Sequence, residues 1–405
     1  IQRDRERVEV VYAFFLDLGM ADWSRLPSEL VREIANQLGE VEDFAAFLMV
    51  CTSWRSAAPK QEWNPRVPQL PWLILAESNG SESETTTRGF YNLGRNKRYD
   101  LNVPETHGRR CWGSEIGWMF TVGMDLQTHL FNPLSHVQIS LPPLTTFEKH
   151  PYTFDFEEEK PPYPDWIRTR FVRRACVING NRSAPFVTAN NIVVMAIYGD
   201  NSYLALAKPG YESWVSLQDD GNARFHDIVC FKDQIFGIRL DGTLVLCEIE
   251  GPDPPKTSDF ALPHEEVDGW ESIYLVESAA GELLMVLRLN LMVEDYEQCY
   301  KTDGFDVYKF DFSTRKWTEL LDLGDQTLFL GANYSMSFTA SDLNCKANSI
   351  YFADDNWYFW DDCEGGGGHD MGIFNMEGET FEPLYLGDDS RSPFSPPTWV
   401  MPRLA

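Results

Sequence analysis

Four pairs of adjacent aspartates are the first candidates for chemistry in this 405-residue sequence: Asp219-Asp220, Asp354-Asp355, Asp361-Asp362 and Asp388-Asp389. Two carboxyl groups that face each other across an open channel can act as acid and base in glycoside cleavage. Neighbouring acids in turns instead point apart, and they mostly cap loops or face water. We interpret the pairs as solvated turn residues, and an enzyme acting on a carbohydrate or small molecule stays open as the alternative.

A second candidate is metal binding around the glycine run 365–368. Possible ligands flank this run: Asp361, Asp362, Cys363, Glu364, His369 and Asp370. Carboxylates without a rigid frame bind cations poorly, and the run lacks the Gly-Lys-Ser/Thr of a phosphate loop. The sequence contains no His-Glu-x-x-His pair and no Gly-x-Ser-x-Gly elbow. We therefore predict a polar, flexible loop with no metal, no cofactor and no catalytic residue.

A cluster of arginines offers binding chemistry instead. Arg168, Arg170, Arg173 and Arg174 lie close together in the sequence, with Phe171 among them. Their spacing lets Arg168 and Arg170, and also Arg170 and Arg174, share the face of a strand. Guanidinium groups bind carboxylates and phosphates in a bidentate manner, which suits an acidic or phosphorylated peptide. The four are the predicted target-binding residues, and the alternative is a surface strand that offsets Glu157 to Glu159.

The cysteines and the apolar runs indicate the compartment. Eight cysteines are spread singly with no Cys-x-x-Cys pair, which favours reduced, mostly buried thiols over a disulfide framework. No apolar run approaches the ~20 residues that span a bilayer. The seven-residue run from Val10 to Leu16 is a poor signal peptide. We expect a protein of the nucleus, the cytoplasm or both.

The charge balance narrows the partners. The chain has 34 Lys and Arg against 62 Asp and Glu, a formal net charge of -28. A negative field repels phosphate backbones and anionic lipid headgroups, so neither nucleic acid nor a membrane is an expected partner.

Only the first part of the chain has a helical period. Leu30, Ile34 and Leu38 recur at i, i+4 and i+8, and Phe44, Phe47, Leu48 and Cys51 form a second stripe. A third short helix carries Trp54 and Arg55 and ends near Pro59. Three short helices cannot bury two apolar stripes among themselves, so we expect something else to cover one of them.

From about residue 72 onward the sequence predicts short strands. A strand–turn–strand phrase recurs, beginning at His129, Tyr203, Asp306 and Met371, and it is typical of outer hairpins in repeated four-stranded sheets. Units of about 40–50 residues imply a propeller. Five units can be placed, and the first strands begin a sixth that the C-terminus closes. We predict six blades, with two stacked sandwiches as the alternative.

The helical segment resembles an F-box. The matching positions follow the family pattern of Leu-Pro, apolar residues at helical spacing, and Val-Cys-x-x-Trp-Arg. The resemblance implies that this segment binds a Skp-type adaptor and, through it, a cullin–RING ubiquitin ligase. The residues expected to bind the adaptor are Leu26, Pro27, Leu30, Ile34, Leu38, Phe44, Phe47, Val50, Cys51, Trp54 and Arg55.

The remainder resembles plant F-box proteins with a kelch-like C-terminal domain of unknown function, type two-nine-five. Phrases such as Cys111 to Trp118 and Asn348 to Phe352 follow in the family order over nearly the whole chain. The resemblance implies a non-catalytic substrate receptor, and it names no target. The predicted fold is an α+β multidomain chain: an extension at 1–22, a three-helix F-box at 23–63, a proline-rich connector at 64–71 and an all-β propeller at 72–405.

This division locates the negative charge. Residues 1–66 carry a net charge of -3, and the other residues carry -25. We therefore expect a target protein with a basic face, except near the arginine cluster, and a role in which this chain holds the target without reacting. A non-degradative interaction protein is a further alternative.

Overall fold

The structure is a computed structural model that describes residues 22–59, 69–77, 86–149, 163–180, 189–219, 224–265, 267, 272–293, 299–343, 345–385 and 387–404. The chain divides into two compact units, Ile1–Val67 and Pro68–Ala405. Residues 1–21 of the predicted extension, most of the connector and the acidic loop 157–159 lie outside the described residues.

The first unit contains the three predicted helices. They are α2 (Ser28–Gln37), α3 (Val41–Met49) and α4 (Thr52–Ala57), preceded by the 3₁₀ turn η1 (Trp23–Arg25). Pro27 is the N-cap residue of α2, and its ψ of 141° lies outside the helical range, so the helix begins at the next residue. Glu29 lies in the first turn, where the helix dipole favours an acidic side chain. The interior of the unit is formed by Val31, Ala35, Val41, Phe44, Phe47 and Leu48.

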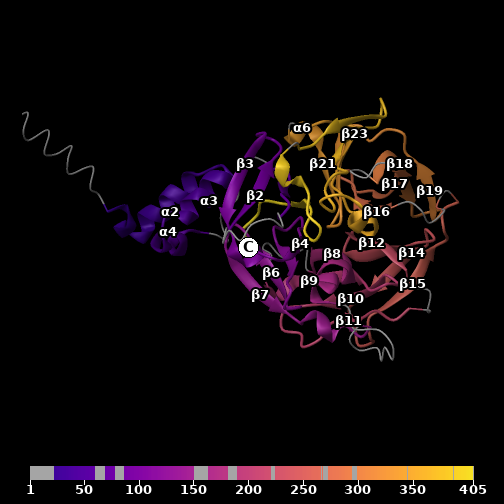
Figure 1. The fold of residues 1–405 in the computed structure, drawn as a ribbon, viewed down its shortest axis with the longest axis horizontal. Helices are drawn as coiled ribbons and strands as arrows, with labels where there is room; N and C mark the ends of the chain where they lie inside the picture. Colours follow the sequence, from indigo (N-terminus) through magenta and orange to yellow (C-terminus); the bar gives the residue numbers. More distant parts are fainter. Residues whose placement is uncertain are drawn as a thin grey trace, which may run out of the picture. The chain divides into compact units, whose positions relative to one another are not determined.

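The second unit is a propeller, because its described strands form six sheets (Figure 1). The first sheet joins both ends of the unit, and its order is β25 (Thr398–Val400), β1 (Trp72–Ile74), β2 (Thr87–Asn92), β3 (Lys97–Asn102). The second is β4 (Arg110–Trp112), β5 (Met119–Val122), β6 (Thr128–Asn132), β7 (Val137–Leu141). The third is β8 (Val172–Asn179), β9 (Ile192–Tyr198), β10 (Tyr203–Ala207), β11 (Val215–Ser216).

The other three sheets complete the ring. The fourth is β12 (Phe225–Phe231), β13 (Gln234–Arg239), β14 (Leu244–Glu248), β15 (Lys256–Ala261). The fifth is β16 (Ser272–Glu277), β17 (Leu283–Met292), β18 (Tyr300–Asp311), β19 (Lys316–Glu319). The sixth has five strands, in the order β21 (Met336–Thr339), β20 (Gln326–Leu330), β22 (Ser349–Phe352), β23 (Gly372–Asn375), β24 (Thr380–Pro383).

Short helical turns connect the strands. They are η2 (Pro104–Thr106), η3 (Leu144–Thr146), α5 (Pro164–Trp166), η5 (Ile167–Phe171), η6 (Ala189–Asn191), α6 (Ala340–Leu343), η7 (Trp357–Asp362) and η8 (Asp388–Ser390). No helix among the described residues is both long enough and apolar enough to cross a membrane.

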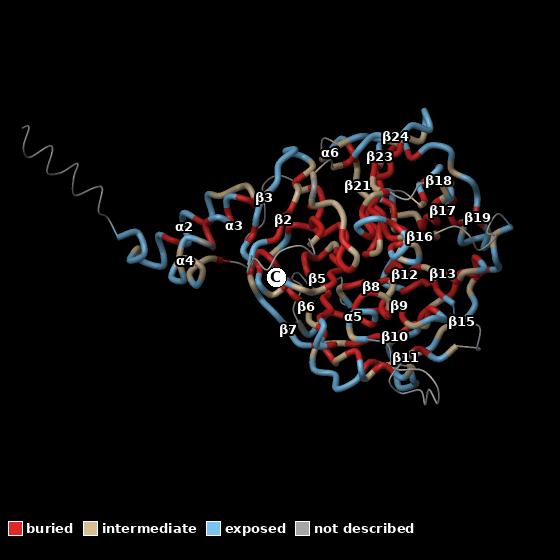
Figure 2. Tube along the Cα trace, viewed as in Figure 1, coloured by how far each residue is buried: buried red, intermediate tan, exposed pale blue. Residues whose placement is uncertain are grey.

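The first strand of each sheet lines the centre of the ring. Consecutive inner strands are in contact from β25 to β4, β8, β12, β16 and β21. The ring closes where β25 pairs antiparallel with β1 and where Trp399 donates its indole N–H to Leu330 O at 2.9 Å. Figure 2 shows buried residues concentrated along the inner and middle strands. The six-bladed prediction is confirmed, and the four repeated phrases form the outer hairpins β6–β7, β10–β11, β18–β19 and β23–β24.

Two local predictions are wrong. The glycine run 365–368 is not a flexible loop: Gly366, Gly367 and Gly368 are buried, and Gly368 N–H donates to the Asp354 carboxylate at 2.6 Å. A Cβ on Gly367 would lie 2.4 Å from the Trp360 ring, so the backbone approaches that ring in a way that only glycine permits. The second error concerns the cysteines, because Cys299 and Cys363 form a disulfide while the other six are free.

Candidate functional site

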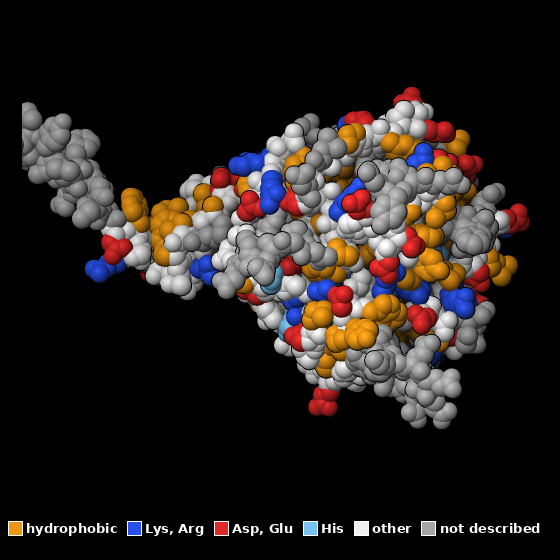
Figure 3. Space-filling model, viewed as in Figure 1, with side chains coloured by type: hydrophobic (Ala, Val, Ile, Leu, Met, Phe, Trp, Pro, Cys, Tyr) orange, Lys and Arg blue, Asp and Glu red, His pale blue; other side chains and the backbone are white. Residues whose placement is uncertain are grey.

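The outer face of α2 is an apolar surface that the helical unit does not use internally. Leu30 and Ile34 are 52% and 36% exposed, whereas Val31 and Ala35, one position further along the helix, are buried. The unit therefore packs through the second pair and leaves the predicted stripe in solvent. Pro27 and Val50 are exposed as well, and Figure 3 shows hydrophobic side chains gathered on this unit. We call Pro27, Leu30, Ile34 and Val50 the helical face.

The other predicted adaptor-binding residues are less accessible. Leu26, Leu38, Cys51, Trp54 and Arg55 are half-buried. Phe44 and Phe47 are interior, at 0% and 5% exposure, and their rings stack at 6.0 Å. In the chain by itself the stripe on α3 is the core that the helices share, and contact of these two phenylalanines with an adaptor stays a prediction.

Trp54 and Arg55 hold the helices together. The indole N–H of Trp54 donates to Trp23 O at 2.8 Å, and its ring packs against Phe47 at 4.7 Å. Arg55 donates from Nε to Leu48 O at 3.1 Å, which satisfies a carbonyl near the end of α3. Both side chains therefore position the helical face, and each retains a half-exposed part.

The arginine cluster does not lie on shared strand faces. Arg168 and Arg170 belong to the π-helical turn η5, and only Arg173 and Arg174 lie on β8. Arg168 pairs with Asp165 and Arg170 with Asp361. Arg174 is buried between inner strands, with its guanidinium 2.9 Å from Asp355 and 3.5 Å from Asp227. It is therefore a structural residue of the channel, and three of the four predicted target-binding arginines already hold carboxylates.

A buried charge network links the third, fourth, fifth and sixth sheets near the centre of the ring, which we call the channel. Arg288 on β17 is 1% exposed and pairs with Asp355 at 3.0 Å and with Asp370 at 2.9 Å. Tyr274 donates to Asp355 at 2.9 Å, and burial together with Asp355 raises the pKa of its phenol. Burial raises the pKa of Asp227 to about 6, although Arg174 and two backbone N–H groups favour its ionised form.

The aspartate pair at 354–355 therefore has structural partners. Asp354 accepts hydrogen bonds from the Tyr300 hydroxyl at 2.8 Å and from two backbone N–H groups. Asp361 and Asp389 form ion pairs with Arg170 and Arg98. Asp220 lies outside the described residues. No group of three or more His, Cys, Asp or Glu in the described ranges is arranged to hold a metal ion.

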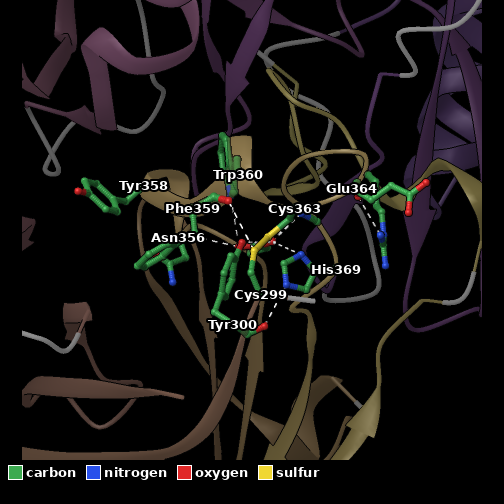
Figure 4. Close-up of a disulfide and its surroundings, with 12 residues drawn as sticks. Cys299, Tyr300, Asn356, Tyr358, Phe359, Trp360, Cys363, Glu364 and His369 are labelled. Atoms are coloured by element: carbon green, nitrogen blue, oxygen red, sulfur yellow. Dashed lines mark hydrogen bonds and ion pairs between the residues drawn. A yellow bond between two sulfur atoms is a disulfide. The ribbon is translucent and has the colours of Figure 1, made fainter. Parts of the chain in front are cut away.

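The disulfide joins loops of neighbouring blades. Cys299 precedes Tyr300 at the start of β18, and Cys363 follows η7, with 5.9 Å between their Cα atoms. Figure 4 shows Tyr300 and His369 beside the sulfur atoms, with Trp360 and Phe359 from η7 nearby. The ring of His369 lies 4.4 Å from that of Tyr300, and its Nε2 is 3.0 Å from Tyr300 O. The disulfide thus ties η7 to the fifth blade.

A pocket of about 510 Å³ opens beside η7, where the inner strands β8, β12 and β16 begin. Its wall includes Arg173, His226, Asn290, Trp357, Tyr358 and Phe359. The guanidinium carbon of Arg173 lies 4.4 Å from the centre of the Trp357 ring, a cation–π distance. Sequence reasoning singled out Arg173 and its neighbour Arg174, which also lines this pocket, but it did not predict the pocket itself, because the lining residues come from strands and turns that are far apart in the chain.

Comparisons with known proteins agree with the division into a helical unit and a propeller. Residues 23–64 match the F-box domain, and residues 90–375 match the KIB1-4 beta-propeller. The chain belongs to the KIB1-4 beta-propeller family. With both domains present, it is a plant-type F-box protein, as the sequence predicted.

Relatives of this F-box protein come from Arabidopsis thaliana. F-box protein SKIP23 is 24% identical, over 94% of this chain and 96% of its own length. Putative F-box protein At5g55150 is also 24% identical, over 91% of this chain and 94% of its own length. Among solved structures, a protein from Lactobacillus plantarum matches 62% of this chain and 66% of its own, at 12% identity and a TM-score of 0.35, a likeness too weak to carry an argument.

Proposed function

We propose that this F-box protein is the substrate-recognition subunit of a Skp–cullin–F-box ubiquitin ligase, acting in the nucleus, the cytoplasm or both. The observation that carries the proposal is the helical face: Leu30 and Ile34 are exposed on an F-box domain whose own core is already complete. An apolar face of this kind is stabilised when a partner covers it. The adaptor is the partner expected for an F-box.

In this proposal the propeller holds a target protein and the chain makes or breaks no bond. The ligase accelerates ubiquitin transfer by bringing the target lysine close to the charged conjugating enzyme, which raises the effective concentration of the two reactants. The structural partners of Asp354 and Asp355 support this view over an enzyme, since both carboxylates stabilise the channel.

Co-purification with a plant Skp-type adaptor tests the adaptor contact. Replacing Leu30 or Ile34 by Asp places a charge in the apolar contact, and we expect a loss of affinity of at least about thirtyfold. Arg32→Ala is the matched control, because Arg32 is exposed on the same helix about half a turn away. Equal binding by all the variants would reject the helical face as the contact.

Target turnover separates a degradative receptor from a non-degradative interaction protein. Proximity labelling in plant cells, with wild type and with Leu30→Asp, identifies candidate targets. A degradative receptor predicts that these candidates accumulate when the proteasome is inhibited, and that Leu30→Asp has the same effect without the inhibitor.

A further inference from the structure

The pocket beside η7 contains a partly desolvated cation, Arg173, and the wall also includes Asp200 and Asp355. Arg173 donates to the Ser202 hydroxyl and to Asp200 O, the latter at 2.9 Å. No carboxylate of the described residues lies within ion-pair distance of its guanidinium, in contrast to Arg168, Arg170 and Arg174. Burial lowers the pKa of Arg173 to about 10, although the charge of nearby Asp200 favours the protonated form.

Three polar atoms in the same pocket lack partners. Arg173 Nε, His226 Nε2 and Asn290 Oδ1 are buried, and none of them makes a hydrogen bond to a described residue. Buried donors and acceptors are rarely left unpaired in folded proteins, because each unpaired group costs about 1–3 kcal/mol. Three such atoms on the walls of one pocket therefore indicate that a ligand supplies the missing partners.

The walls also offer aromatic surface. Trp357 lies under the Arg173 guanidinium, Tyr358 is 64% exposed, and Phe359 completes this side. Arg170 donates to Trp357 O at 2.6 Å, and the disulfide secures the end of the same turn. The aromatic wall is therefore fixed in place, which lowers the entropic cost of binding a flat group against it.

We propose that this pocket binds an anionic group, a carboxylate or phosphate, joined to an aromatic or other flat apolar body, with Arg173 and His226 on the charge and Trp357 on the body. In a substrate receptor this ligand is an acidic side chain beside an aromatic one in a target peptide. The identification of the ligand as part of a target peptide rests on the proposed function, whereas the pocket's preference for an anion does not.

Small probes test the pocket on the full chain. Titration calorimetry uses phenyl phosphate and phenylacetate as anionic probes, inorganic phosphate without the ring, and phenol as the neutral probe. We expect both aromatic anions to bind more tightly than phenol or inorganic phosphate. Arg173→Gln should weaken them by about tenfold or more, because a charge-assisted hydrogen bond is lost. Arg98→Gln, which removes an arginine of the outer strand β3, should leave both affinities unchanged.

A second variant protects the test against misfolding, since Arg173 also holds the 200–202 turn. Trp357→Leu should weaken phenyl phosphate more than inorganic phosphate, because only the ring contacts the indole. The proposal is overturned if phenol binds as well as phenyl phosphate, or if neither variant changes the affinity of either aromatic anion.

Peptide probes test whether the anionic group belongs to a target peptide or to a small molecule. A blocked hexapeptide with one aspartate next to one phenylalanine should bind in the same pocket and be displaced by phenyl phosphate, and its asparagine counterpart should not bind. Binding of the small anions without the peptide overturns the peptide carrier and leaves the anion site. Adaptor co-purification is measured in parallel, so failure of the ligase proposal and failure of the pocket proposal give different results.

Discussion

At the residue scale, the channel depends on arginines that replace water as partners of buried carboxylates. Arg288 has the largest part, since it contacts Asp355, Asp370, Thr302 and the Ala353 carbonyl. A buried ion pair adds little net stability compared with an apolar pair, but removal of one member leaves an uncompensated charge.

Arg288→Met should therefore lower the free energy of unfolding by about 3–5 kcal/mol, since Asp370 loses its cation and Asp355 keeps only Arg174. Urea unfolding followed by tryptophan fluorescence measures the change. Arg98→Met is the matched control, because Arg98 is about half exposed and each of its ion pairs, with Asp100 and with Asp389, should contribute about 1 kcal/mol or less. Comparable losses in the two variants would mean that the channel network is not more costly to break than a surface pair.

His226 gives the stability a predictable pH dependence. Burial and the nearby Arg174 and Arg173 lower the pKa of its imidazole to about 3. Below about pH 6.5 the unfolded chain takes up a proton that the folded chain refuses, so this residue makes the fold less stable as the pH falls. Asp227 opposes the trend, because its raised pKa, about 6, makes the folded chain the better proton acceptor between about pH 6 and pH 4.

Comparing His226→Gln with wild type isolates the histidine. Between about pH 7.5 and pH 5 the wild type should lose up to about 2 kcal/mol more stability than the variant. Urea midpoints at the two pH values provide the measurement. A variant that loses as much stability as wild type over this range would show that His226 is protonated in the folded protein.

At the scale of elements, the disulfide connects the pocket's aromatic wall to the ring. It closes a sequence separation of 64 residues, and a cross-link of this length stabilises by about 2–4 kcal/mol, mainly by restricting the unfolded chain. Cys299→Ser with Cys363→Ser should lower the unfolding free energy by that amount. Reductant should bring wild type down to the level of the double variant and leave the variant unchanged. Cys345→Ser, which removes a free thiol, should keep the wild-type response.

The sequence predicts those elements whose apolar residues recur with a regular period. Outer hairpins such as β18–β19 alternate and end in recognisable turns, so they were located correctly. The strands β4, β15 and β25 have no such signal, because β4 and β25 have only three residues each and β15 is mostly polar. The parallel pairing of β20 with β22 has no local signal either.

The site was harder to predict than the fold, for the same physical reason. Arg288 meets Asp370 across 82 residues, and Cys299 meets Cys363 across 64. Only the closed ring brings such residues together, and no local sequence pattern relates residues that are this far apart in the chain. The stripe of Leu30 and Ile34 was found because both residues lie on one helix, whereas the interior position of Phe44 depends on how three helices pack.

At the scale of the whole molecule, the burial of arginines affects the net charge of the exposed surface. Residues 67–405 carry a net charge of -25, and several of their arginines, including Arg88, Arg110, Arg174 and Arg288, are buried. The exposed surface is therefore more acidic than the composition suggests. A target that delivers an acidic group to Arg173 has to offer basic surroundings, since long-range repulsion otherwise opposes its approach.

Flanking charge on the peptide probe tests this field. The Asp-Phe hexapeptide extended by lysines should bind more tightly than the same peptide extended by glutamates. The difference should shrink as salt rises, because exposed charges are screened over about 10 Å at 0.1 M. Equal affinities at low salt would place the pocket outside the influence of the acidic surface.

The two compact units should also separate by truncation. Each has its own core, with Phe44 and Leu48 in the first unit and the inner strands in the second, and the ring is closed by β25 and β1, which both lie after residue 67. A chain that begins at residue 68 should therefore unfold in a single cooperative transition at the wild-type temperature, and it should bind phenyl phosphate with wild-type affinity. Adaptor binding should be lost entirely, since the helical face is gone.

A chain that ends at residue 396 is the control: it lacks β25, so the ring stays open and its cooperative transition should weaken or disappear. If the first truncation destabilised the propeller as much as the second, the helices would be part of the propeller's fold, and the adaptor would compete with that role.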